Sequence, residues 1–232
     1  MNSEIFFNLS TDKISIIVFD KDKKEDIYNK TQNFDKSLSK DIFIKKNLNS
    51  TLEKQILYIE KIIGRSLNKI NLMIDDSSDL VITASSKKNY DKKPVQKSQI
   101  EYLIQDLKQQ IQKSNQELKI LHIVVNNFIL DGDIFKEIPL NKFCNNLVVE
   151  VKFICIKKNL ISFIEDIFSR YQIEIRSIIS TKYAKSLVAN YTINIQEARS
   201  MILSGSNYNE VLVSPKKTGK LGFFERIFHL LS

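Results

Sequence analysis

Short apolar runs of strand length alternate along this chain with stretches whose apolar residues repeat at helical spacing. Strand-type runs occur at 14–19, 70–74 and 147–154, and helical spacing is found within 52–63 and 100–111. A chain of 232 residues with this alternation is long enough to bury a proper hydrophobic core. The pattern therefore predicts a mixed α/β or α+β fold.

The N-terminus has the pattern of a β-hairpin. Residues 5–7 form an apolar run, a mostly apolar run resumes at 14–19, and the turn formers of 8–12 lie between them. The charged stretch 20–36 is expected to link this hairpin to the first helix. A second pair of runs, 120–125 and 127–130, leads into an Asp131-Gly132 turn.

A lysine-rich stretch at 85–94 is interpreted as an exposed basic turn. It carries Lys87, Lys88, Lys92 and Lys93. A phosphate-binding loop is not expected there, because no glycine is present to let backbone amides surround a phosphate.

The cysteines and histidines do not form a metal or redox motif. Cys144 and Cys155 lack metal-ligand spacing, and His122 and His229 are the only imidazoles in the chain. Both cysteines are expected in the core, and His122 is expected to be a structural residue of a strand. Neither a metal nor another cofactor is predicted.

Charge and hydropathy restrict the expected location and the expected partners of the chain. The excess of 35 Lys and Arg over 27 Asp and Glu gives +8, which suits an anionic membrane or nucleic acid. No apolar run approaches the ~20 residues that span a bilayer, and residues 1–4 do not resemble the start of a signal peptide. A cytoplasmic location is expected. A basic nucleic-acid-binding protein remains an alternative, although no such motif is present and nucleic acid is not the expected partner.

The C-terminal segment 221–232 predicts an amphipathic helix that lies in the plane of a membrane surface. Its apolar residues occupy about half of the helix circumference, and basic residues surround them. The expected membrane-binding residues are Lys216, Lys217, Lys220, Leu221, Phe223, Phe224, Arg226, Ile227, Phe228, Leu230 and Leu231.

Several segments together resemble FtsA, the actin-like cell-division protein that tethers the FtsZ ring to the membrane. Residues 118–132 are similar to the family's "ILHVLPQEFSVDG", residues 52–74 to its first helix and following strand, and 222–228 to its membrane-targeting helix. The resemblance implies a partial actin-like (ribonuclease H-like) lobe with an inserted strand-helix-strand-strand subdomain.

The resemblance also implies domain boundaries and partners. The lobe would occupy 1–84 and 173–206, the inserted subdomain 85–172, a linker 207–220 and the membrane helix 221–232. The implied partners are the anionic inner face of the cell membrane and divisome proteins at the division site. FtsZ and an FtsA-like protomer are the candidates among those proteins.

The first hairpin departs from the family's phosphate-binding pattern. Where actin-like ATPases have a "DIGTSK"-like turn, this chain has Asn8, Ser10 and Thr11, so the carboxylate and the glycine are both missing. No counterpart of the second phosphate motif appears between residues 189 and 220. A non-catalytic cell-division adaptor is therefore expected, and a pilus or secretion assembly scaffold of the PilM type is the alternative.

Overall fold

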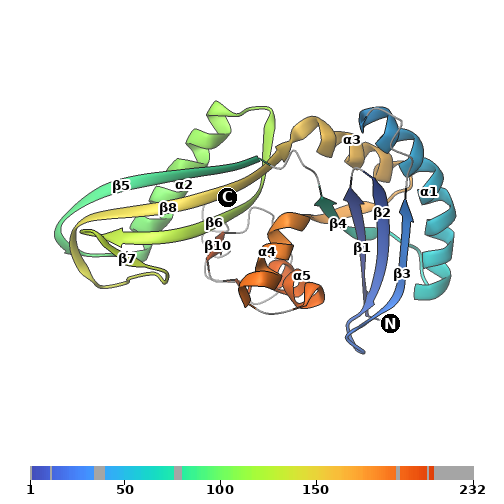
Figure 1. The fold of residues 1–232 in the computed structure, drawn as a ribbon, viewed down its shortest axis with the longest axis horizontal. Coiled ribbons are helices and arrows are strands. Elements are labelled where there is room, and N and C mark those ends of the chain that lie inside the picture. Colours follow the sequence, from blue (N-terminus) through green and yellow to red (C-terminus); the bar gives the residue numbers. More distant parts are fainter. Residues whose placement is uncertain are drawn as a thin grey trace. The chain divides into compact units, whose positions relative to one another are not determined.

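A computed structural model describes residues 2–10, 12–33, 40–75, 80–191, 194–207 and 209–211, with the backbone alone for 40–50. Its elements, in chain order, are β1 (Ser3–Ser10), β2 (Lys13–Asp20), β3 (Glu25–Asn33), α1 (Lys40–Ile63), β4 (Lys69–Asp75), β5 (Leu80–Pro94), α2 (Lys97–Ser114), β6 (Leu118–Leu130), β7 (Asp133–Phe135), β8 (Phe143–Lys157), α3 (Lys158–Ser169), β9 (Glu174–Ser180), α4 (Thr181–Tyr191), α5 (Ile195–Ser204) and β10 (Glu210–Val211). Figure 1 shows their arrangement.

The described residues form two compact units. The first is drawn from Met1–Ser78 and Asn159–Ser186, and the second from Asp79–Lys158 and Leu187–Ser232. The helix α3 belongs to the first unit, although the sequence analysis placed it in the inserted subdomain. One reason is packing, since the Phe168 ring of α3 meets the Phe7 ring of β1 edge-on with centroids 5.2 Å apart.

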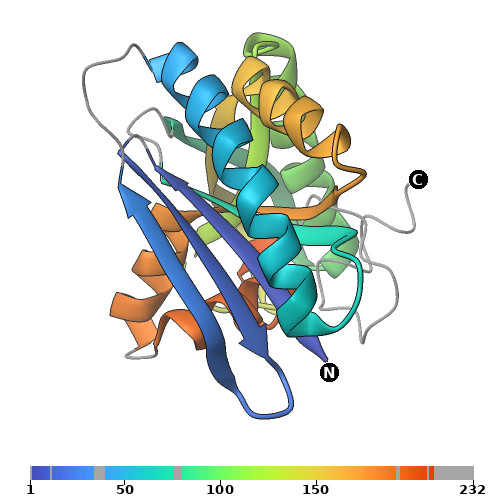
Figure 2. The same ribbon diagram turned by 90° about the vertical axis from the view of Figure 1, so that its right-hand side faces the viewer.

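The first unit is built on a five-stranded sheet with the order β3-β2-β1-β4-β9. The predicted hairpin is confirmed, because β1 and β2 pair antiparallel, and β3 continues the meander on the other side of β2. On its other edge β1 pairs parallel with β4, and β4 pairs parallel with β9. Helices α1 and α3 lie over one face of this sheet (Figure 2). This strand order is that of the ribonuclease H-like sheet of an actin-like lobe, so the predicted fold class is confirmed.

The strand β3 corrects the sequence prediction for 20–36. That stretch was expected to link the hairpin to a helix, but Glu25–Asn33 pairs with β2 along its whole length. As an edge strand with mostly exposed side chains, β3 has no need of the apolar alternation that reveals a half-buried strand.

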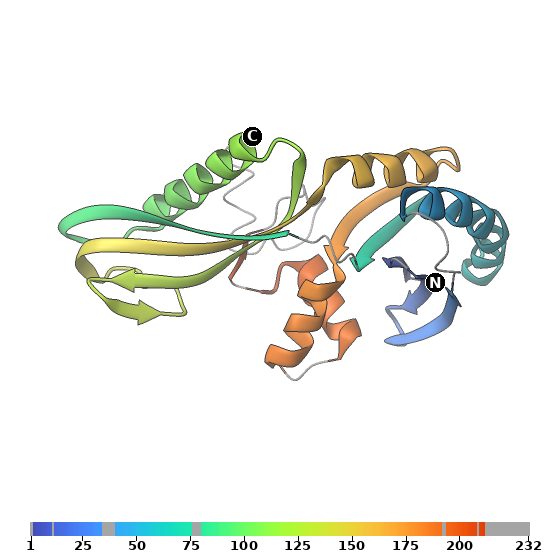
Figure 3. The ribbon, with the colours of Figure 1, turned by 45° about the horizontal axis from the view of Figure 1, so that its top comes forward.

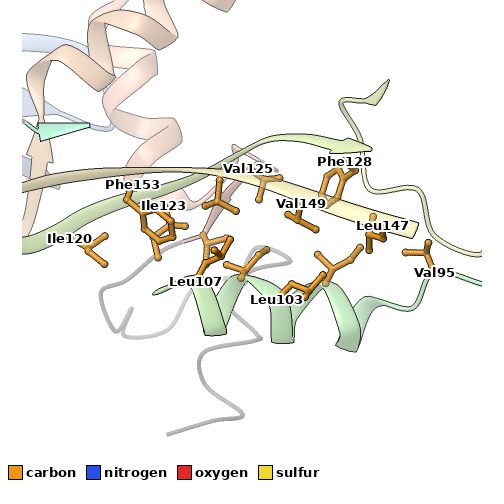
Figure 4. Close-up of a cluster of buried hydrophobic side chains, with 14 of the residues drawn as sticks. Val95, Leu103, Leu107, Ile120, Ile123, Val125, Phe128, Leu147, Val149 and Phe153 are labelled. Carbon is orange, nitrogen blue, oxygen red and sulfur yellow. The ribbon is translucent and has the colours of Figure 1, made fainter. Parts of the chain in front are cut away.

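The second unit contains a four-stranded antiparallel sheet with the order β10-β6-β8-β5 and the short β7 beside β6. Helix α2 packs on one face of the sheet (Figure 3). Figure 4 shows Leu103 and Leu107 of α2 pointing towards apolar side chains of β6 and β8. The β6–β7 connection is the predicted Asp131-Gly132 turn, in which both residues have positive φ, as a two-residue hairpin loop requires.

Two predictions within this unit were wrong in detail. The stretch 85–94 is not a turn but the second half of β5, which pairs with β8 from Leu80 to Pro94. The runs 120–125 and 127–130 are one strand, β6, whose register shifts near Val125 instead of breaking. Such a bulge lets a long strand bend without ending.

We expect Phe153→Ala in β8 to lower the free energy of unfolding by about 3–5 kcal/mol, because its side chain is fully buried in this core. Phe143→Ala is the matched control: it lies on the same strand but is 73% exposed, so its cost should stay below about 0.5 kcal/mol. Urea denaturation of both variants measures the difference. Equal costs would show that the core is not where the structure places it.

The two cysteines are buried, as predicted. Burial, with a smaller contribution from the Asp131 charge, raises the pKa of Cys144, and burial raises the pKa of Cys155 to about 11. Because the reactive species is the thiolate, a raised pKa leaves both groups as inert thiols at pH 8. Modification by a thiol reagent at pH 8 should be at least about 100-fold slower in the native protein than in urea. Rapid reaction of either native cysteine would contradict this burial.

Candidate functional site

Polar side chains gather where the three parallel strands of the first unit end. The parallel register sets Ser10 of β1 beside Asp75 of β4, and Ile74 of β4 beside Ser180 of β9. In open α/β sheets the carboxyl ends of the strands form the usual ligand site. This edge therefore holds the side chains that would meet a ligand, and their chemistry decides which one.

The hairpin side of this edge carries no carboxylate at the position where an actin-like ATPase has one. Asn8 is there instead, and its Oδ1 accepts a hydrogen bond of 3.2 Å from the Thr181 hydroxyl at the start of α4. The Ser10 hydroxyl lies 2.8 Å from Asp12 Oδ1 and donates to it. Thr11, the third residue of the predicted degenerate phosphate loop, lies outside the described residues.

The carboxylate that is present on the neighbouring strand has a cationic partner. Lys185 Nζ of α4 lies 2.9 Å from Asp75 Oδ2. Within 2–10, 12–33, 40–75, 80–191, 194–207 and 209–211, no group of three or more His, Cys, Asp and Glu side chains is placed to hold a metal ion. Mg²⁺ prefers carboxylate oxygens, whereas position 8 offers a neutral amide and Asp75 already forms an ion pair with Lys185.

The polar side chains of this edge thus form hydrogen bonds and an ion pair with one another and with neighbouring residues of the first unit. Each of the side chains at positions 8, 10 and 75 has a hydrogen-bond or ion-pair partner within the first unit. A phosphate placed there would compete with these contacts, and the hairpin offers no glycine for close backbone approach.

A buried His122–Glu210 pair lies in the second unit and was not foreseen as a pair. His122 Nδ1 of β6 is 2.7 Å from Glu210 Oε1 of β10, and both side chains are at most 2% exposed. Val125 N–H also donates to the Asn209 carbonyl oxygen at 2.8 Å. His122 is therefore a structural residue with a hydrogen-bond partner, as expected. Its contact with Glu210 holds β10 against β6. No local signal reveals this contact, because the two residues are 88 positions apart.

Part of the predicted linker 207–220 is consequently structured. Residues 210–211 form β10 and pair with Val124 and Ile123 of β6. The predicted membrane-binding residues from Lys216 to Leu231 fall within 212–232, which lies outside the described residues, so their role stays a prediction. No helix in the described part of the chain is long and apolar enough to cross a bilayer.

No protein-family model and no curated protein sequence matches this chain. Solved structures similar to this chain include the following three. One is the cytoplasmic domain of EpsL, an inner-membrane component of the type II secretion system of Vibrio cholerae, with 12% identity over 79% of this chain and 57% of that chain and a TM-score of 0.39. Another is a Bacteroides thetaiotaomicron protein with an actin-like ATPase fold and unknown function, with 17% identity over 82% of this chain and 55% of that chain and a TM-score of 0.31. A PilM–PilN type IV pilus biogenesis complex has 8% identity over 81% of this chain and 50% of that chain and a TM-score of 0.49.

This chain spans between 50% and 57% of the length of those three chains. At such low identities and TM-scores the likeness carries no argument about activity or partners. The actin-like fold of the first unit therefore stands on its own strand order and strand directions.

Proposed function

We propose that this protein is a non-catalytic adaptor that holds an assembly of proteins at the inner face of a membrane. The observation that carries the proposal is the closed polar edge of the first unit. Asn8 bonds to Thr181 and Asp75 pairs with Lys185, so the position of a nucleotide in an actin-like lobe is already engaged. Because function lies in sites and does not follow from the fold, such a lobe can serve a role other than nucleotide binding, and we propose that this role is protein binding.

The membrane part of the proposal rests on the sequence of 221–232. Its aromatic and aliphatic residues share one face, and Lys216, Lys217 and Lys220 precede it. Burying one such apolar side chain contributes roughly 1.5–3 kcal/mol, whereas each lysine near an anionic surface contributes about 1 kcal/mol. The apolar face should therefore dominate binding, with the lysines adding a salt-sensitive share.

The assembly is proposed to be either the divisome or a pilus or secretion apparatus. The segments that resemble FtsA favour the first, with FtsZ or an FtsA-like protomer as partner. A scaffold of the PilM type is the second candidate. Cross-linking and affinity capture from native membranes separates them: recovery of FtsZ supports the divisome, and recovery of inner-membrane pilus or secretion components supports the second setting.

Calorimetry should detect no binding of Mg-ATP at micromolar to submillimolar concentrations. The physical reason is that the first hairpin lacks both the carboxylate that faces metal-bound phosphates and the glycine that admits them. An actin-like ATPase titrated under the same conditions is the positive control. A micromolar affinity for ATP that depends on magnesium would refute the non-catalytic assignment.

Phe224→Glu combined with Phe228→Glu should abolish co-sedimentation with anionic vesicles, and a chain ending at Thr218 should behave alike. Neutralising Lys216, Lys217 and Lys220 to Gln should weaken binding mainly at low salt, since surface attraction is screened over about 10 Å at 0.1 M salt.

The matched control for this experiment is Ile134→Glu combined with Phe143→Glu. These apolar residues are 65% and 73% exposed in the second unit, so the same change in charge falls on two exposed apolar side chains outside the proposed anchor. The control should sediment like the wild type. If the chain ending at Thr218 also did so, the membrane anchor would lie elsewhere.

A further inference from the structure

One long strand edge of the second unit has no partner within the described part of the chain. β5 is the last strand in the order β10-β6-β8-β5 and pairs only with β8. Its register against β8 is regular from Leu80 to Asn89 and shifts only between Asn89 and Lys93. Along these ten residues, every second residue therefore offers its N–H and C=O groups to a further strand.

The first seven residues of this edge carry none of the usual protection against pairing. Residues 80–86 read Leu-Val-Ile-Thr-Ala-Ser-Ser, without charge, proline, glycine or bulge. Leu80 and Val81 are 45% and 51% exposed. Soluble proteins normally guard an edge with lysine, proline or a bulge, and β5 has such features only from Lys87 onwards. Residues 80–86 are uncharged and lack proline and glycine, which is the composition of a strand that is paired on both edges.

We propose that residues 80–86 of β5 pair antiparallel with the same residues of a second copy of this chain. The two four-stranded sheets would then continue into one another around a twofold axis near Thr83. Such an interface is isologous, so it closes at two copies. Across the axis Thr83 would face Thr83 of the second copy, and Val81 would face Ser85, which are favourable or neutral cross-strand pairs.

Lys87 and Lys88 determine the register of this pairing, and the lack of charge in 80–86 favours a second copy over an acidic peptide as the partner. With the axis at Thr83, the two Lys87 residues lie eight positions apart along the strands, about 27 Å. Sliding the register towards the bulge would bring Lys87 and Lys88 of both copies together, and this would be repulsive. The paired stretch itself is uncharged, so the strand that matches it best is also uncharged and rich in β-branched residues, as 80–86 is.

Helix α2 adds an aromatic side chain beside the same edge. Lys88 Nζ of β5 lies 5.8 Å from the centroid of the Tyr102 ring, which places Tyr102 over β5, and this tyrosine is 66% exposed. A twofold axis perpendicular to the sheets brings both α2 helices to the same face of the joined sheet. Seven paired residues with a tyrosine on each side form a small interface, so the dimer should be reversible, with a dissociation constant on the order of tens of micromolar.

Self-association through β5 does not depend on the membrane role, but it would strengthen it. A dimer carries two copies of the segment 221–232, and the second anchor would bind at the high effective concentration set by the first. A dimer with two weakly binding anchors would therefore bind a membrane more tightly than a monomer with one.

Sedimentation of the full chain at up to about 300 µM tests the dimer. Thr83→Lys and Thr83→Glu should each weaken it at least about tenfold, because like charges would meet at the axis. An equimolar mixture of the two variants should recover the dimer, since Lys would then face Glu. Gln112→Lys on the exposed part of α2 is the control with the same change of charge and should dimerise like the wild type.

Cysteine cross-linking gives a second readout at the same residue. Opposed residues of antiparallel strands have Cα atoms about 4.5–5.5 Å apart, within the range of a disulfide. Thr83→Cys should form a covalent dimer under mild oxidation and Gln112→Cys should not, while the native cysteines stay buried. A wild type that stays monomeric at about 300 µM would overturn the proposal. So would a dimer that both charged variants leave intact, or a mixture of them that does not recover it.

Discussion

The pairing of β1 on both of its edges is the interaction on which the first unit depends. β1 joins the antiparallel meander of β2 and β3 to the parallel strands β4 and β9. Its side chains Phe6 and Phe7 are at most 1% exposed, so the strand is buried on both faces. Because β1, β4 and β9 run in the same direction, their carboxyl ends meet at one edge. That edge is where Asn8, Asp75 and Thr181 come together.

The segment 80–157 of the second unit can be inserted between β4 and α3 because the two ends of this segment lie side by side. Leu80 at the start of β5 pairs with Cys155 near the end of β8. A segment whose ends pair with each other can be added between β4 and α3 as a closed structure. Within the described residues the far edge of β5 has no partner, and we propose that residues 80–86 pair there with a second copy. The buried His122–Glu210 contact then fastens β10, the last described strand, to the same sheet.

Much of this fold could be predicted from local sequence patterns, and the misses share a cause. The β1–β2 hairpin, the helices and the Asp131-Gly132 turn follow from apolar periodicity and turn residues. The edge strand β3 and the second half of β5 were missed because an edge strand is held by backbone pairing on one side, and its exposed side chains can be charged. Of the candidate site, Asn8 and Ser10 were found from the missing carboxylate and glycine. The partner of Asn8, Thr181, needed a contact across 173 residues, and Glu210 needed one across 88 residues.

We propose that the lobe binds no nucleotide and that the C-terminal segment binds the membrane. Hydrogen–deuterium exchange of the full chain, measured alone, with Mg-ATP and with anionic vesicles, tests both parts in one experiment. We expect Mg-ATP to leave exchange in 2–10 and 12–33 unchanged, and vesicles to slow exchange within 212–232. Protection of the β1–β2 hairpin by Mg-ATP, or unchanged exchange of 212–232 on vesicles, would contradict this proposal.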